Sequence, residues 1–313
     1  MRSAAGHYIP EFYLKGFTEK KGLLWVHEKN GSPRASTPKR EANQPDYYAL
    51  SDDVTDSDSV EKMYARTESI VALAISKSRN PLFLMNDEDA GNIRAFVALS
   101  FTRVPHFIDF VKETQIDLAK KLAAKSAHQD QKFEETVVKV NERYGTQIDP
   151  DEARNLFLKG DYKLSHKNND FALASMMRVT QKIIRILVEE FEHDLLYAPE
   201  GSSFITTDSP VVTLINEGDG SALFGLGFAH LRTEVFFPLN KRAAMHLRRG
   251  ATRQKLYVSS SRVDEINRAL MRWGQTCMYA SSGNRRIGRL FTQYAGTIKF
   301  GKTALLHPRY KSQ

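Results

Sequence analysis

A long helical stretch in the middle of the sequence most constrains the fold. Between residues 60 and 194, apolar residues recur at the three- and four-residue spacing of helices. This spacing predicts helices over about 60–78, 87–104, 106–144 and 170–194. Strand-like segments separated by turn residues lie before it, at 7–50, and after it, from about residue 203 onward. Strands and helices do not alternate, as they would around a parallel sheet. The pattern therefore predicts an α+β protein with a helical middle region, an antiparallel β-rich C-terminal part and a short N-terminal β segment.

One part of the helical region differs from the rest. Residues 123–170 are charged and only weakly apolar. A helix with so little apolar surface has little to pack against the body of the protein. We predict that 123–170 forms a projecting helical arm, with a mobile insertion as the alternative.

Composition indicates where such a chain works. No run approaches the roughly 18 consecutive apolar residues of a membrane helix. The first residues, MRSAAGHYIPEF, lack the apolar core of a signal peptide. The single cysteine, Cys277, excludes an internal disulfide framework. We therefore expect a soluble, cytoplasmic protein with no membrane contact.

The basic residues are numerous and partly clustered. The formal net charge is +8, and six basic residues fall within fifteen positions. A patch of this kind steers anionic partners, most commonly nucleic acid. The alternative is a basic protein that binds no such partner. The predicted nucleic-acid-binding residues are Lys241, Arg242, Arg248, Arg249, Arg253 and Lys255.

Five segments, in order, carry a family resemblance. They are HYIPEFYLKGF (7–17) with LLWVHEK after it, the Tyr47-Tyr48 strand with the acidic helix that follows, FTRVP (101–105), FITTDSPVV (204–212) and FFPLNKRAAMHL (236–247). In this order and spacing the chain resembles the bacterial family catalogued as domain of unknown function 4238. Two positions depart from its pattern: Ser100 replaces a frequent glutamine, and Ser209 replaces the usual asparagine. The resemblance implies one domain, which we place at 1–313, and a set of polar positions, but no reaction.

His7 is the first of these polar positions. It precedes a run of apolar and aromatic residues that would hold the imidazole in place. A fixed imidazole suits a general base, a metal ligand or a phosphate contact. The alternative is a structural histidine satisfied by a backbone carbonyl.

Glu61, Glu68 and Arg103 form a second group. The two glutamates lie seven residues apart, on one face of a predicted helix. They could bracket a cation, or simply face solvent. Arg103 ends an apolar helix, and a buried cation requires a partner. Glu68 is the natural candidate, whether the pair clips two helices together or serves a bound phosphate.

Asp208 lies in the sequence TTDSP, between two apolar strands. An aspartate two residues before a proline commonly forms a turn with its own backbone. Alternatively, the strand ends could mount an acidic group rigidly beside a pocket.

These residues support two hypotheses. The first is a phosphodiester hydrolase acting on nucleic acid, with His7, Glu68, Arg103 and Asp208 as catalytic residues. In that hypothesis Glu61, Glu68 and Asp208 would hold a divalent metal such as magnesium or manganese. The second is a non-catalytic nucleic-acid- or protein-binding regulatory module, in which the same residues form a structural polar network. A defence or toxin-type effector is compatible with either.

Overall fold

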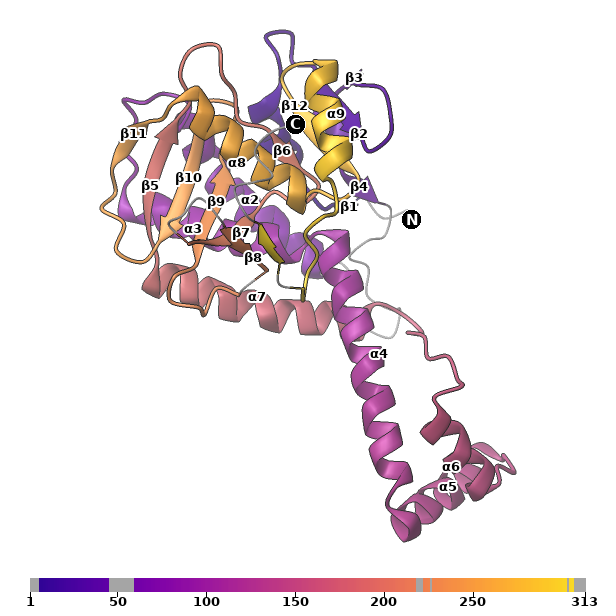
Figure 1. Ribbon diagram of the computed structural model, residues 1–313. Helices are drawn as coiled ribbons and strands as arrows, with labels where there is room; N and C mark the ends of the chain where they lie inside the picture. Colours follow the sequence, from indigo (N-terminus) through magenta and orange to yellow (C-terminus); the bar gives the residue numbers. More distant parts are fainter. Residues whose placement is uncertain (1–5, 45–58, 218–221, 226, 303, 307–313) are drawn as a thin grey trace.

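The computed structural model describes residues 6–44, 59–217, 222–225, 227–302 and 304–306. It is an α+β protein, with a body built around two sheets and a helical arm that projects from it (Figure 1). The helices are α1 (Glu11–Leu14), η1 (Lys15–Phe17), η2 (Pro38–Arg40), α2 (Ser59–Lys77), α3 (Asp87–Thr102), α4 (Pro105–Ala127), α5 (Asp130–Tyr144), α6 (Pro150–Lys159), α7 (Asp170–Glu190), α8 (Ser260–Trp273) and α9 (Arg285–Tyr294).

Three sheets form among the described residues. The strands are β1 (Gly6–His7), β2 (Leu24–Glu28), β3 (Arg34–Ser36), β4 (Asn43–Gln44), β5 (Glu192–Tyr197), β6 (Thr206–Thr207), β7 (Val212–Asn216), β8 (Ala222–Phe224), β9 (Glu234–Pro238), β10 (Ala243–Arg248), β11 (Lys255–Tyr257), β12 (Cys277–Ala280) and β13 (Ala304–Leu306). The large sheet has the order β11-β5-β10-β9-β7-β8-β13, the second has the order β3-β2-β12-β6, and β1 pairs with β4.

Helices cover both faces of the large sheet, which explains why its central strands are apolar on both sides. Leu195 and Tyr197 of β5 pack in one core with residues of α2, α3 and α7. Leu196, between them, packs in a second core with residues of α8. This split follows from the two-residue period of a strand. The α+β class and the β-rich C-terminal part are as the sequence predicts.

The second sheet joins the two ends of the chain. Its strand β12 pairs antiparallel with β2, so that Tyr279 lies opposite Val26. It also pairs with β6, where Met278 lies opposite Thr207. The N-terminal β segment is therefore part of a sheet that includes C-terminal strands.

Three local predictions were wrong. The helix predicted over 106–144 is two helices, because the chain leaves helical geometry at Gln129, with φ −103° and ψ 81°. The helix predicted to end at Asp194 ends at Glu190, and β5 begins two residues later. Strand β11 runs parallel to β5, whereas an antiparallel strand was predicted. The predicted Tyr47–Leu50 strand lies outside the described residues.

The arm has a small core of its own. α4 carries the chain away from the body, and α5 and α6 pack at its far end (Figure 1). Buried residues Ala127, Phe133, Val137 and Ala153 form this core, and Phe157 packs against it. Arg154 binds Glu134 at 3.1 Å beside it. Because so few side chains are buried in it, this core stabilises the arm much less than the larger cores stabilise the body.

We expect Phe133→Ala to unfold α5 and α6 without unfolding the body. Phe133 is 3% exposed, and removing a buried phenylalanine costs about 3–5 kcal/mol. That cost exceeds the folding free energy that so small a core can supply. Hydrogen exchange should show lost protection in 130–159 only. The control is Val138→Ala, because Val138 is 49% exposed in the same helix. Equal loss of protection in β5 and β10 would contradict an independent arm.

Candidate functional site

The N-terminal motif is anchored in the core of the body. Pro10 begins the short helix α1, and Tyr13 is 1% exposed. The Tyr13 hydroxyl donates to the carbonyl of Pro238 at 2.7 Å and lies 3.1 Å from Thr206 Oγ1. These contacts join the motif to β6 and β9, in two of the other family-like segments. The motif is thus a rigid mount for the residues just before it.

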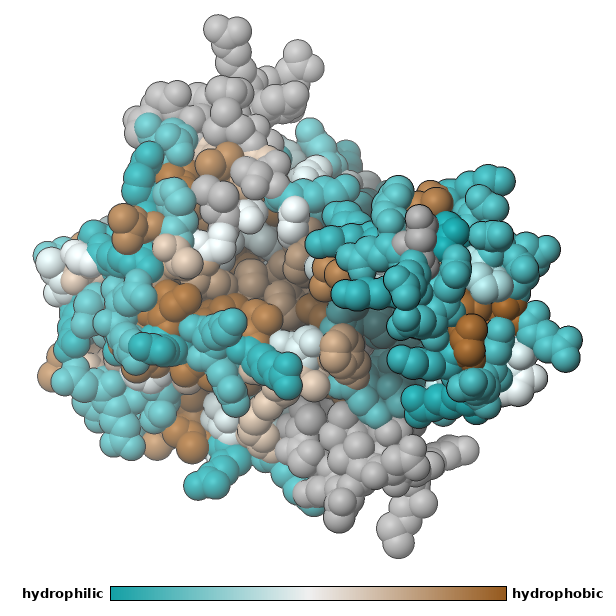
Figure 2. All heavy atoms as spheres, turned by 90° about the horizontal axis from the view of Figure 1, so that it is seen from below, coloured by the Kyte–Doolittle hydropathy of each residue, from teal (hydrophilic) through white to brown (hydrophobic). Residues whose placement is uncertain are grey.

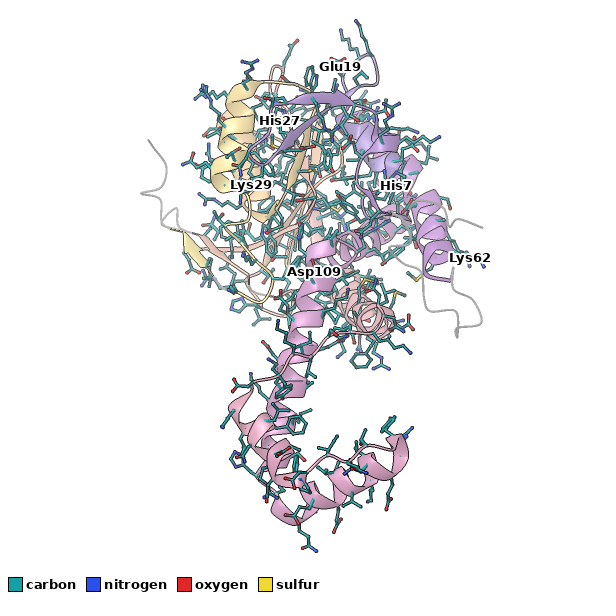
Figure 3. The ribbon with its side chains drawn as sticks, turned by 90° about the vertical axis from the view of Figure 1, so that its right-hand side faces the viewer. His7, Glu19, His27, Lys29, Lys62 and Asp109 are labelled. Atoms are coloured by element: carbon teal, nitrogen blue, oxygen red, sulfur yellow. The ribbon has the colours of Figure 1, made fainter. Side chains whose placement is uncertain are left out.

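Two contacts hold His7 in place, one at its imidazole ring and one at its backbone carbonyl. Its Nε2 lies 3.2 Å from the carbonyl oxygen of Lys39. Its own carbonyl accepts a hydrogen bond from the guanidinium of Arg103. In Figure 3, His7 lies at the edge of the body, above the upper part of α4 that Asp109 marks. The ring contact is the one expected of a structural histidine.

Arg103 and Glu68 form the predicted pair. Arg103 Nη1 donates to Glu68 Oε1 at 2.8 Å, and its guanidinium carbon lies 4.4 Å from the centre of the Tyr64 ring. The Arg103 side chain is 2% exposed, and that of Glu68 is 24% exposed. Three different partners therefore surround a nearly fully buried cation, which fixes the turn between α3 and α4.

Asp208 anchors a distant segment, so the alternative of a turn to its own backbone was wrong. Its side chain is 1% exposed, and it accepts hydrogen bonds from the amides of Gln275 at 2.8 Å, Thr276 at 2.6 Å and Cys277 at 3.1 Å. The Thr276 hydroxyl adds a fourth hydrogen bond at 2.6 Å. Thr207 closes the local turn instead, because its hydroxyl bonds to the backbone of Ser209.

His106 is the residue that sequence reasoning missed. It lies in the first turn of α4, and its Nε2 is 3.5 Å from Asp208 Oδ2. Burial alone would raise the pKa of Asp208, but His106, Thr276 and the amide of Gln275 lower it below its usual value. The carboxylate is therefore ionised at neutral pH. The imidazole is 25% exposed, so it faces both a fixed anion and solvent. Its position directly after the FTRVP segment was the available signal.

Two ionisable groups near Asp208, the Tyr8 hydroxyl and the Cys277 thiol, are neutral at pH 7. Burial, then the charge of Asp208, raise the pKa of Tyr8 above its ordinary value, against the effect of a hydrogen bond with Tyr279. Burial and the same carboxylate raise the pKa of Cys277 to about 11. Cys277 is consequently a thiol at neutral pH and a poor nucleophile.

Two buried polar atoms lie on the segments that hold Asp208. Ser209 Oγ and Trp273 Nε1 have no hydrogen-bond partner among the described residues. A buried polar atom without a partner costs about 1–3 kcal/mol, and such atoms commonly mark a site for water or a ligand. Ser209 is also one of the two departures from the family pattern.

Two of the three predicted metal ligands, Glu68 and Asp208, are engaged in other contacts. In the described part of the chain, no group of three or more His, Cys, Asp or Glu side chains is placed to hold a metal ion. Glu68 is directed at Arg103, and the oxygens of Asp208 accept four hydrogen bonds. Glu61 belongs to α2, but its side chain lies outside the described residues.

The predicted basic patch is engaged in contacts within the fold. Three arginines bind carboxylates and the other three residues bind backbone carbonyls. The pairs are Arg248–Asp194, Arg249–Glu190, Arg253–Glu192 and Arg253–Asp87, with Lys241 on Thr18, Arg242 on Pro199 and Lys255 on Pro81. These contacts neutralise much of the charge that a nucleic acid would meet, and nucleic-acid binding by these residues stays a prediction.

Comparison with known proteins gives one match. No curated protein and no solved structure matches the chain. No helix within the described ranges is both long and apolar enough to cross a membrane. A family model described as a protein of unknown function (DUF4238) matches residues 6–283 and includes all five family-like segments. The match covers most of the sequence, so the chain belongs to the DUF4238 family.

Proposed function

We propose that this protein is a hydrolase that cleaves phosphodiester bonds in nucleic acid by acid–base chemistry at His106. One observation carries the proposal: a partly exposed imidazole lies 3.5 Å from a buried carboxylate that four hydrogen bonds hold in place. A buried carboxylate in this position orients an imidazole and stabilises its protonated form. The net charge of +8 favours an anionic substrate.

The reaction needs one proton acceptor. His106 would take a proton from the attacking water or ribose hydroxyl while the new oxygen–phosphorus bond forms. The bond from phosphorus to the leaving oxygen then breaks, and the imidazolium returns the proton to that oxygen. Asp208 stays ionised throughout and holds the ring.

Arg103 is proposed here as a positioning residue, whereas the first hypothesis made it catalytic. Its guanidinium is buried against Glu68 and the carbonyl of His7, so it is not free to face a phosphate. It precedes His106 by three residues and fixes the start of α4. We assign Arg103, Glu68 and His7 to positioning and His106 to catalysis.

Cleavage of labelled RNA and DNA tests the proposal, with magnesium, manganese or a chelator present. We expect cleavage that persists in the chelator and falls about 100- to 10,000-fold in His106→Gln, the usual contribution of general acid–base catalysis. The matched control is His128→Gln, because His128 is exposed on the arm and should keep full activity. Absence of cleavage in every lane would exclude a nuclease. If His106→Gln cleaves as fast as wild type, the reaction takes place at another site in the molecule.

A second candidate, a protein-binding regulatory module of the effector type, is favoured by the arm. Figure 2 shows apolar side chains on the underside of the body and on the arm, with a hollow between them. On the arm helices α4 and α5, the side chains of Leu118, Leu122 and Val138 are 55%, 57% and 49% exposed. The test is to delete residues 130–159. Loss of the biological effect would favour this module if the deletion leaves nuclease activity unchanged, or if the full-length protein has no nuclease activity either. Both proposals place the protein in the cytoplasm, where a single free cysteine is common.

A further inference from the structure

A cleft on the body lies apart from His106. It has a volume of about 400 Å³, at the small end of the range for small-molecule sites. Three segments build it: the end of the N-terminal motif, the C-terminal half of α2 and the turn after β9. The lining residues are Phe12, Lys15, Gly16, Thr18, Ala72, Ile75, Ser76, Arg79, Leu239 and Asn240. His106 and Asp208 are not among them.

The ionisable residues of this lining are both cations, Lys15 and Arg79. One Arg79 nitrogen donates to the carbonyl of Lys15 at 3.0 Å, which leaves its remaining N–H groups for another acceptor. No carboxylate pairs with Arg79 in the described part of the chain. Lys15 binds Glu11 at 2.8 Å, but both side chains are exposed, and water weakens such a pair.

Further positive charge lies next to the cleft. Lys241 donates to the carbonyl of Thr18 at 2.7 Å. Burial lowers the pKa of Lys241, and the charges of Arg79 and Arg242 lower it further. Burial is the largest of these causes and Glu19 opposes them, but Arg79 and Arg242 both add positive potential beside the cleft. An anion bound to Arg79 would relieve that potential.

The last carbonyl groups of α2 carry partial negative charge and would repel an anion in the cleft. Side chains of the protein already donate hydrogen bonds to one of them. The carbonyl of Ile75 accepts hydrogen bonds from Ser78 Oγ at 2.7 Å and Asn240 Nδ2 at 3.5 Å. Asn240 is fully buried and its oxygen accepts from the amides of Arg242 and Ala243. The cleft therefore presents N–H donors on one side and apolar surface on the other.

We infer that this cleft binds a small organic phosphate. Its phosphate group would accept hydrogen bonds from Arg79 and Lys15, and an aromatic or apolar part would lie against Phe12 and Ala72. A guanidinium binds phosphate oxygens two at a time, which suits Arg79 to this place. The inference goes beyond the proposed hydrolase, because the two sites share no residue.

Calorimetric titration of the full chain with adenosine monophosphate, inorganic phosphate and adenosine, at low salt, tests this inference. We expect the monophosphate to bind most tightly, phosphate more weakly, and adenosine at least tenfold more weakly than the monophosphate. Arg79→Gln should weaken monophosphate binding at least tenfold, whereas Lys20→Gln should change it less than twofold, because Lys20 is exposed and outside the lining.

Three outcomes would overturn the inference. They are no binding of either phosphate compound, equal binding of adenosine and its monophosphate, and equal affinity in wild type and Arg79→Gln. Arg79 is exposed, so its substitution should leave the fold intact, and circular dichroism spectra of the variants check this. Nuclease activity is measured separately and is expected to be the same in wild type and Arg79→Gln.

Discussion

Replacing Arg103 with alanine is expected to lower the free energy of unfolding by about 3–5 kcal/mol, the usual cost of breaking a buried ion pair from one side. Arg103 is 2% exposed and contacts Glu68, the carbonyl of His7 and the ring of Tyr64. Alanine would leave a cavity and two acceptors without a donor. Urea unfolding followed by circular dichroism measures the change.

Two further variants separate the pair from general damage to the helices. Glu68→Gln should cost only about 1 kcal/mol, because the amide oxygen of glutamine can still accept the hydrogen bond from Arg103 and because Glu68 is 24% exposed. Arg66→Ala, at an exposed position of the same helix, should change the free energy of unfolding by less than about 0.5 kcal/mol. An Arg103→Ala variant as stable as Arg66→Ala would show that the buried contacts contribute nothing net.

Arg103 also shows what the sequence makes predictable. A cation within an apolar run has to be paired, and a glutamate on the neighbouring helix was the obvious partner. The argument needed only local pattern and the cost of a buried charge. The amphipathic helices α2 and α7 follow from the same kind of local rule, since apolar spacing alone fixes their buried faces.

The pair of His106 and Asp208 could not be found in this way. The two residues are 102 positions apart, and Asp208 is placed by amides of residues 275–277, which follow α8. That contact depends on how β6 and β12 meet in the second sheet, which no local periodicity encodes. The ion pairs of the arginines within 241–255 could not be found from the sequence for the same reason, because their carboxylate partners lie in α3, α7 and β5.

Asp208→Asn is expected to lower the free energy of unfolding by about 3 kcal/mol at pH 7, because an amide nitrogen would replace one of two oxygens that together accept from three backbone N–H groups and a hydroxyl. The variant should also remove a pH dependence. The folded-state pKa of Asp208 lies below its ordinary value of about 3.9, so the ionised carboxylate stabilises the fold fully above that pH. Its contribution is lost as the pH falls through the folded-state pKa.

Urea unfolding of wild type and Asp208→Asn at pH 7, 5, 4 and 3 measures this contribution. The difference between the two proteins should be constant from pH 7 to 5 and should shrink below about pH 4. Asp264→Asn is the control, because Asp264 is exposed in α8 and should show almost no difference at any pH. A difference for Asp208→Asn that stays constant down to pH 3 would mean that lost packing, and not the charge, causes the instability. In that case His106 would lack the fixed anion on which the proposed chemistry depends.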